Sequence, residues 1–212
     1  MKKEDYSLRT ARWVVSAIVR LNTKVRDFWT NAYGWAPKSA ADLLNRSRLD
    51  RQVSLSHCLS IWLDPSITES SSGVSIGDPA QAVLDAQTDG RLILAWANLG
   101  SLVEGTMKFF LCVFEHDYSN SPATFGKAQM PLEPDDLQFE TLKQFFGKRI
   151  WSGTQRERWT RFVDLVQQRR NAIHAYKDRE IGTMREFYTA VKNYLVFLAE
   201  IEGCVPYPDE PR

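Results

Sequence analysis

Residues 91–114 have the sequence RLILAWANLGSLVEGTMKFFLCVF, which is apolar around nearly the whole circumference of a helix. A surface helix carries its apolar side chains on one stripe, whereas a helix that is apolar on all sides is buried on all sides. The uncharged stretch from Leu92 to Val103 is too short to span a bilayer, and Glu104 and Lys108 follow it. We therefore expect a central helix around which the rest of the chain packs, and no transmembrane helix.

The segments on either side of this helix also show helical periodicity. Between residues 10 and 31, apolar side chains recur at spacings of three and four until Gly34 and Pro37 end the pattern. Further helices are expected over residues 39–63, 139–146, 155–176 and 184–202. No segment has the alternation that is typical of a strand, and the chain contains no internal repeat. The predicted fold class is therefore all-α, in the form of a single helical bundle.

We predict one domain over residues 1–212. Its expected parts are N-terminal helices over 1–63, a loop over 64–79, a helical core over 80–202 and a C-terminal tail over 203–212. The loop is rich in serine, glycine and proline, which favour turns and compete with regular structure. A boundary between two domains at this loop is the alternative, but the helices before it are few for an independent core.

The composition is that of an ordinary globular protein, with 43% hydrophobic and 25% charged residues. The 27 basic and 26 acidic residues leave a net charge of +1, which excludes the overall positive excess of proteins that coat duplex DNA. Any contact with nucleic acid must therefore come from a local patch. Basic residues do gather at positions 156, 158, 161, 169, 170, 177 and 179. The alternative for this cluster is a solvated helix face.

Cysteine spacing and the N-terminal residues indicate the expected location. The three cysteines lie far apart and form no Cys-x-x-Cys pair, so we expect neither a zinc site nor a disulfide framework. The first six residues include acids where a signal peptide has a purely basic start. We therefore expect a cytoplasmic protein without a metal site.

The segment RRNAIHAY, residues 169–176, has the residue types of a chemical site. If the predicted helix continues through it, Arg170 and His174 stand one turn apart on the same side. An imidazole that titrates near neutrality can accept and return a proton, and a guanidinium can neutralise charge developing at a phosphorus centre. The alternative is that His174 borders the core and the arginines are solvated.

The pattern Arg169-x4-His174-x-Tyr176 resembles the signature of HEPN-domain proteins, in particular that of a plasmid-borne bacterial HEPN family. The resemblance implies a helical bundle of the HEPN type, with residues 80–202 as the HEPN-like core and additional N-terminal helices. Members are commonly homodimers, and many are metal-independent endoribonucleases in toxin–antitoxin, phage-defence or RNA-processing systems. It therefore implies RNA and an antitoxin protein as partners, and no cofactor.

The same resemblance suggests a role for each candidate residue. His174 would act as acid and base at an RNA 2′-hydroxyl, and Arg169 would stabilise the phosphate. Two registers compete, because Arg169 has the expected four residues before the histidine whereas Arg170 begins the Arg-Asn pair with only three. The residues expected around the substrate are Asn171, Tyr176, Lys177 and Glu104, the last as a buried partner of one cation.

Two other functions fit the same sequence. One is a catalytically silent HEPN-like module that binds RNA or a nucleotide through these cations. The other is a helical interaction protein, because apolar residues of the final helix recur in heptad-like order at positions 184, 191 and 198.

Overall fold

The computed structural model describes residues 8–64, 79–125, 130–174 and 178–207. These segments contain eight α-helices and one short hairpin, which confirms the all-α fold class. The predicted loop over 64–79 lies outside the described residues apart from its two ends, and so does the end of the predicted tail, from residue 208.

The elements follow one another as α1 (Leu8–Trp29), α2 (Lys38–Arg46), α3 (Leu49–Trp62), α4 (Pro79–Val113), α5 (Glu115–Ser119), β1 (Thr124–Phe125), β2 (Met130–Pro131), η3 (Pro134–Asp136), α6 (Phe139–Phe145), η4 (Phe146–Ile150), α7 (Gly153–Arg170), η5 (Asn171–Ile173) and α8 (Met184–Cys204). No strand was predicted from the sequence, yet β1 and β2 pair as an antiparallel hairpin. Two residues per strand are too few to produce an alternating pattern.

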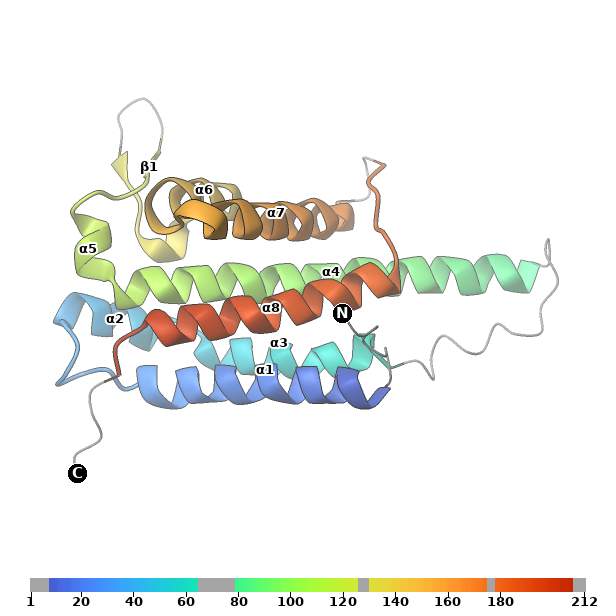
Figure 1. Ribbon diagram of the computed structural model, residues 1–212, viewed down its shortest axis with the longest axis horizontal. Coiled ribbons are helices and arrows are strands. Elements are labelled where there is room, and N and C mark those ends of the chain that lie inside the picture. Colours follow the sequence, from blue (N-terminus) through green and yellow to red (C-terminus); the bar gives the residue numbers. More distant parts are fainter. Residues whose placement is uncertain (1–7, 65–78, 126–129, 175–177, 208–212) are drawn as a thin grey trace.

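Helix α4 runs through the middle of the molecule, as predicted for residues 91–114. In Figure 1, α6 and α7 lie on one side of α4, α1 and α3 lie on the other, and α8 runs alongside it. Trp96, Leu99 and Met107 of α4 have no exposed surface. Among the described residues, no helix is both long enough and apolar enough to cross a membrane.

The sequence predicted one helix over residues 39–63, and the structure divides this segment into α2 and α3. Ser47 adopts an extended backbone (φ −67°, ψ 142°), and its hydroxyl donates to the carbonyl oxygen of Leu44 at 2.6 Å. A serine side chain that bonds a nearby carbonyl competes with helical hydrogen bonding. The break lets both Leu44 and Leu49 reach the core.

Helix α8 packs on this chain's own core. Phe187, Val191, Tyr194 and Leu198 are buried there, and α8 contacts α1, α4 and α7. The heptad-like pattern of the final helix therefore reflects packing within the chain, and it leaves little of the apolar face for another protein.

A buried polar network joins four helices around the hydroxyl of Tyr194. This oxygen lies 3.1 Å from Thr106 Oγ1 and accepts hydrogen bonds from Asn22 Nδ2 at 3.4 Å and Gln52 Nε2 at 3.5 Å. Asn22 also donates to Ser56 Oγ at 2.7 Å. Since buried polar groups are costly unless bonded, these contacts fix how α1 and α3 sit against α4 and α8.

The raised pKa values of two tyrosines predict that the folded protein loses stability at alkaline pH. Burial raises the pKa of Tyr194, and it raises the pKa of Tyr207 to about 12. An unfolded tyrosine loses its proton near a pH of about 10. Above that pH the unfolded chain binds fewer protons than the folded chain, so the free energy of unfolding falls as pH rises through the folded pKa values. Urea unfolding at a series of pH values measures this, and Tyr207→Phe should flatten the decline. A free energy of unfolding that stays constant above a pH of about 10 contradicts the prediction.

Candidate functional site

The segment 169–176 does not continue helix α7, although the sequence predicted a helix to residue 176. Helix α7 ends at Arg170, one 3-10 turn follows over Asn171–Ile173, and His174 leaves that turn with φ −85° and ψ 86°. A 3-10 helix has about 3.0 residues per turn, against about 3.6 in an α-helix, so Arg170 and His174 do not stand one above the other as expected. Tyr176 and Lys177 lie outside the described residues.

Because α7 ends at Arg170, the apolar residues before and after this point differ in burial. Trp159, Phe162 and Val166 are buried, whereas Ile173 is 47% exposed. The indole of Trp159 donates to Glu200 Oε2 at 2.8 Å and lies within the core. It is therefore not available to stack on a base.

Arg169 is a buried cation bound by two carboxylates. Its side chain is only 7% exposed, and its Nη2 atom lies 3.1 Å from Glu180 Oε1 and 3.8 Å from Glu186 Oε1. The Glu180 side chain is 81% exposed, so this ion pair joins a buried guanidinium to a carboxylate at the surface. Among the described residues, no acceptor forms a hydrogen bond with the buried Nε atom of Arg169.

Gly182 allows the chain to pass directly over this guanidinium. Its φ of +71° is a conformation that favours glycine. A Cβ atom at this position would lie 2.5 Å from Glu186 Oε2, 3.1 Å from Arg169 Cζ and 3.2 Å from Arg169 Nε. A larger residue at position 182 would therefore displace the arginine or the glutamate.

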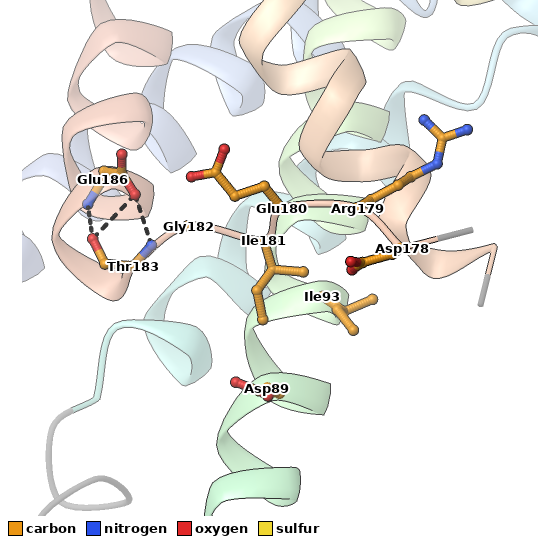
Figure 2. Close-up of a pocket in the computed structure, with 9 residues that line it drawn as sticks. All are labelled: Asp89, Ile93, Asp178, Arg179, Glu180, Ile181, Gly182, Thr183 and Glu186. Carbon is orange, nitrogen blue, oxygen red and sulfur yellow. Dashed lines mark hydrogen bonds between the residues drawn. The ribbon is translucent and has the colours of Figure 1, made fainter. Parts of the chain in front are cut away.

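The start of α8 fixes Glu186 in place. The Thr183 amide donates to Glu186 Oε2 at 2.8 Å, and the Glu186 amide donates to Thr183 Oγ1 at 3.2 Å, which is a capping box (Figure 2). Ile181, just before Gly182, is anchored as well, because its carbonyl oxygen accepts a hydrogen bond from Trp96 Nε1 at 2.8 Å. The chain is thus held in position from Ile181 onward.

An open hollow of about 840 Å³ lies beside this loop (Figure 2). Its lining residues are Asp89, Ile93, Asp178, Arg179, Glu180, Ile181, Gly182, Thr183 and Glu186. Four of these carry carboxylates and one is an arginine, whose guanidinium points away from Asp89 in Figure 2. The surface next to Arg169 is therefore acidic.

Three residues of this site were not predicted from the sequence: Glu180, Gly182 and Glu186. A signal for Glu186 was present, because Thr183 and Glu186 have the Thr-x-x-Glu spacing of a capping box. No comparable pattern pointed to Glu180, which reaches Arg169 because of the path of the loop.

Arg170 is directed to the other side of α7, toward α4 and α6. Its Nη1 atom donates to Glu104 Oε2 at 2.7 Å, and its guanidinium carbon lies 5.3 Å from the centre of the Phe139 ring. Lys108 Nζ approaches the second carboxylate oxygen of Glu104 at 3.1 Å. The structure thus brings Glu104 and Arg170 together. Both Glu104 oxygens contact cations of the protein, which favours a positioning role over contact with a substrate.

Close packing of Gly100 against Arg170 makes a testable prediction. A Cβ atom at position 100 would lie 2.6 Å from Arg170 Cδ and 3.0 Å from Arg170 Cβ. We expect Gly100→Ala to lower the free energy of unfolding by about 1–3 kcal/mol through overpacking. The matched control is Gly90→Ala in the same helix, where a Cβ would have no neighbour within 4 Å. That change should raise stability by about 0.5–1 kcal/mol, because alanine favours helix over glycine. Urea denaturation measures both, and similar effects of the two changes would contradict this packing.

His174 is exposed to solvent at the end of the 3-10 turn. Its amide donates to the Asn171 carbonyl oxygen at 3.2 Å, and within the described residues its imidazole forms no hydrogen bond or ion pair. The structure therefore groups Arg169 with Glu180 and Arg170 with Glu104, and it joins neither guanidinium to the imidazole by a hydrogen bond. The imidazole is exposed to solvent, so a ligand in solution can reach it.

The other arginines of the basic cluster on α7 also have partners. Arg156 Nε donates to the Trp151 carbonyl oxygen at 3.1 Å, Arg158 lies 3.3 Å from Glu200 Oε1, and Arg161 pairs with Glu157. Because they are paired in this way, these arginines do not form one continuous cationic face. Over the described ranges, no three side chains of histidine, cysteine, aspartate or glutamate are grouped to hold a metal ion.

No protein-family model matches the sequence, and no significant match to the chain was found among curated proteins or solved structures. A function for this chain must therefore be inferred from its own residues and from the motif resemblance.

Proposed function

We propose that the protein is a metal-independent endoribonuclease of the HEPN type, with His174 as the acid and base and Arg169 or Arg170 as the cation that stabilises the phosphate. The resemblance extends the proposal to a homodimer that acts in bacterial defence or as a toxin, with an antitoxin protein as its partner.

The observation that carries the proposal is the position of His174. The imidazole is exposed, has no side-chain partner among the described residues, and follows two arginines in the last turn of α7 within four or five residues. A general acid or base must reach the proton that it transfers, and an exposed imidazole at a helix end can be reached by a polymer such as RNA.

In the proposed reaction, the phosphorus of the RNA backbone exchanges its bond to a 5′-oxygen for a bond to the neighbouring 2′-oxygen. His174 accepts the proton of a 2′-hydroxyl, whose oxygen forms a bond to the adjacent phosphorus while the bond to the 5′-oxygen breaks. The protonated imidazole then gives its proton to the departing 5′-oxygen. The products are a 2′,3′-cyclic phosphate and a 5′-hydroxyl. A guanidinium placed at the phosphate offers a fork of donors to its oxygens as negative charge develops.

The arginines require a rearrangement or a second subunit before they act on the same phosphate as His174. Arg169 points to Glu180 and Arg170 points to Glu104, so in one chain both guanidinium groups are paired with carboxylates. In the proposed dimer, the second copy of the segment 169–174 would bring another pair of arginines toward the imidazole.

The test is an RNA cleavage assay with the purified protein in a chelator. We expect single-stranded RNA to be cut without added metal, and the fragments to end in cyclic phosphates, detected by mass spectrometry. Cleavage that disappears on chelation, or fragments that end in 3′-hydroxyl and 5′-phosphate groups, would contradict the proposal.

A second candidate is a module that binds RNA without cutting it. The specific observation in its favour is that neither guanidinium is joined to the His174 imidazole, because Arg169 bonds Glu180 and Arg170 bonds Glu104. In the same assay, this candidate predicts intact RNA that nevertheless shifts in a binding measurement. The candidate in which α8 binds a protein partner has less support, because the apolar face of α8 is buried within the chain.

A further inference from the structure

We propose that Glu180 is an autoinhibitory residue that occupies Arg169 in the absence of RNA, and that a phosphodiester oxygen displaces it. This inference rests on the proposed contact with RNA, and it adds a regulatory step to that contact. It also accounts for the burial of Arg169 beside Glu180 when no RNA is bound.

The first observation is an unused donor on the guanidinium. An arginine binds a carboxylate or phosphate best through two parallel hydrogen bonds from neighbouring nitrogens. Glu180 takes only Nη2, at 3.1 Å, while the buried Nε has no partner among the described residues. A buried donor without a partner destabilises the folded protein. A phosphate that displaces Glu180 from Nη2 and moves the loop at Gly182, which covers Nε, can accept from both nitrogens and so compete with the glutamate.

The second observation is that Glu180 and Glu186 differ in how firmly they are placed. Glu186 is fixed by the capping box of α8, and its nearer oxygen is 3.8 Å from Arg169. Glu180 precedes the anchored Ile181, its side chain is 81% exposed, and among the described residues it pairs with Arg169. Of the two carboxylates, Glu180 is therefore the one that can move away, and the phosphate that replaces it compensates the charge of the buried guanidinium.

The third observation is the charge of the loop. Asp178, Glu180 and Glu186 place carboxylates along the chain next to Arg169, and Asp89 of α4 adds another on the wall of the hollow (Figure 2). These carboxylates repel the phosphates of an RNA, and the departure of Glu180 lowers that repulsion beside Arg169.

The experiment measures binding independently of cleavage. The probe is a short fluorescent single-stranded RNA in which every 2′-hydroxyl is O-methylated, so that it cannot be cut. We expect Glu180→Gln to bind it about threefold more tightly than wild type at equal ionic strength, as loss of one competing surface ion pair implies. The increase should be absent when Glu180→Gln is combined with Arg169→Gln, and present when it is combined with Arg170→Gln.

The matched control is Glu157→Gln, which removes a 68% exposed carboxylate paired with Arg161 on the same helix. It changes the net charge by the same amount, and we expect it to leave affinity unchanged. Equal affinity of Glu180→Gln and wild type would overturn the inference, and so would an equal gain from Glu157→Gln. Circular dichroism checks that each variant is folded.

Failure of this inference can be told apart from failure of the proposed function by assaying the same variants on cleavable RNA. If wild type cleaves but Glu180→Gln binds no more tightly, the nuclease proposal stands and the autoinhibitory role is wrong. If Glu180→Gln binds more tightly but neither protein cleaves, the carboxylate does compete with RNA and the nuclease proposal is wrong.

Discussion

His174→Ala is expected to lower the rate of RNA cleavage by about 10²–10⁴-fold, the usual contribution of a positioned general acid or base. The change removes the only group proposed to accept the 2′-hydroxyl proton. Because the side chain is exposed and has no partner among the described residues, the free energy of unfolding should change by less than about 0.5 kcal/mol. Single-turnover cleavage and urea denaturation measure the two effects separately.

The chain supplies matched controls for this experiment. It has three histidines, and His57 and His116 are also exposed. His57→Ala and His116→Ala should retain the wild-type rate. If all three variants cleave equally well, or if the activity of the preparation survives in His174→Ala, then His174 is not the catalytic base. In that case the nuclease assignment loses its main residue.

Trp96→Ala is expected to have the largest effect on stability, about 3–5 kcal/mol, as for other buried tryptophans and phenylalanines reduced to alanine. Trp96 has no exposed surface, and its ring lies edge to face with Phe187, with 5.2 Å between the ring centroids. Its Nε1 atom also donates to the Ile181 carbonyl oxygen at 2.8 Å. One side chain thus joins α4, α8 and the loop that carries Glu180.

Two further variants separate the contributions of the Trp96 ring and its hydrogen bond. Trp96→Phe keeps an aromatic ring but loses the bond to Ile181, so it should cost less than Trp96→Ala. Trp13→Ala removes a tryptophan that is 63% exposed and should change stability by less than about 0.5 kcal/mol. Urea denaturation gives all three values. A loss in Trp96→Ala no greater than in Trp13→Ala would show that the loop and helices are not joined in this way.

The sequence predicted the positions of the long helices well because their apolar periodicity is strong. Residues 91–113 form the C-terminal part of α4, which begins earlier, at Pro79, and the predicted helix over 184–202 matches α8 within two residues at its end. The break at Ser47 was missed, since no glycine or proline marks it. Whether a helix breaks at such a point depends on which residues before and after it reach the core. A local sequence pattern does not contain this information.

The candidate site was predicted by residue type but not by geometry. The pairing of Glu104 with a cation was expected and is seen with Arg170. The burial of Arg169 was not expected, because the periodic pattern of α7 continues to Tyr176 without a stop signal, whereas the α-helix ends at Arg170. The partner Glu180 arrives through a turn at Gly182, and spacing along the sequence does not report which residues such a turn brings together.

The polar network around Tyr194 means that α1 and α3 are not an appendage to the remaining helices. Deleting residues 1–63 would strip Asn22, Gln52 and Ser56 from the Tyr194 hydroxyl and uncover the apolar surface that α1 and α3 shield. A shortened chain of this kind would gain water-exposed hydrophobic area and lose its internal amide contacts at the same time. Work on the RRNAIHAY segment should therefore start from the intact polypeptide.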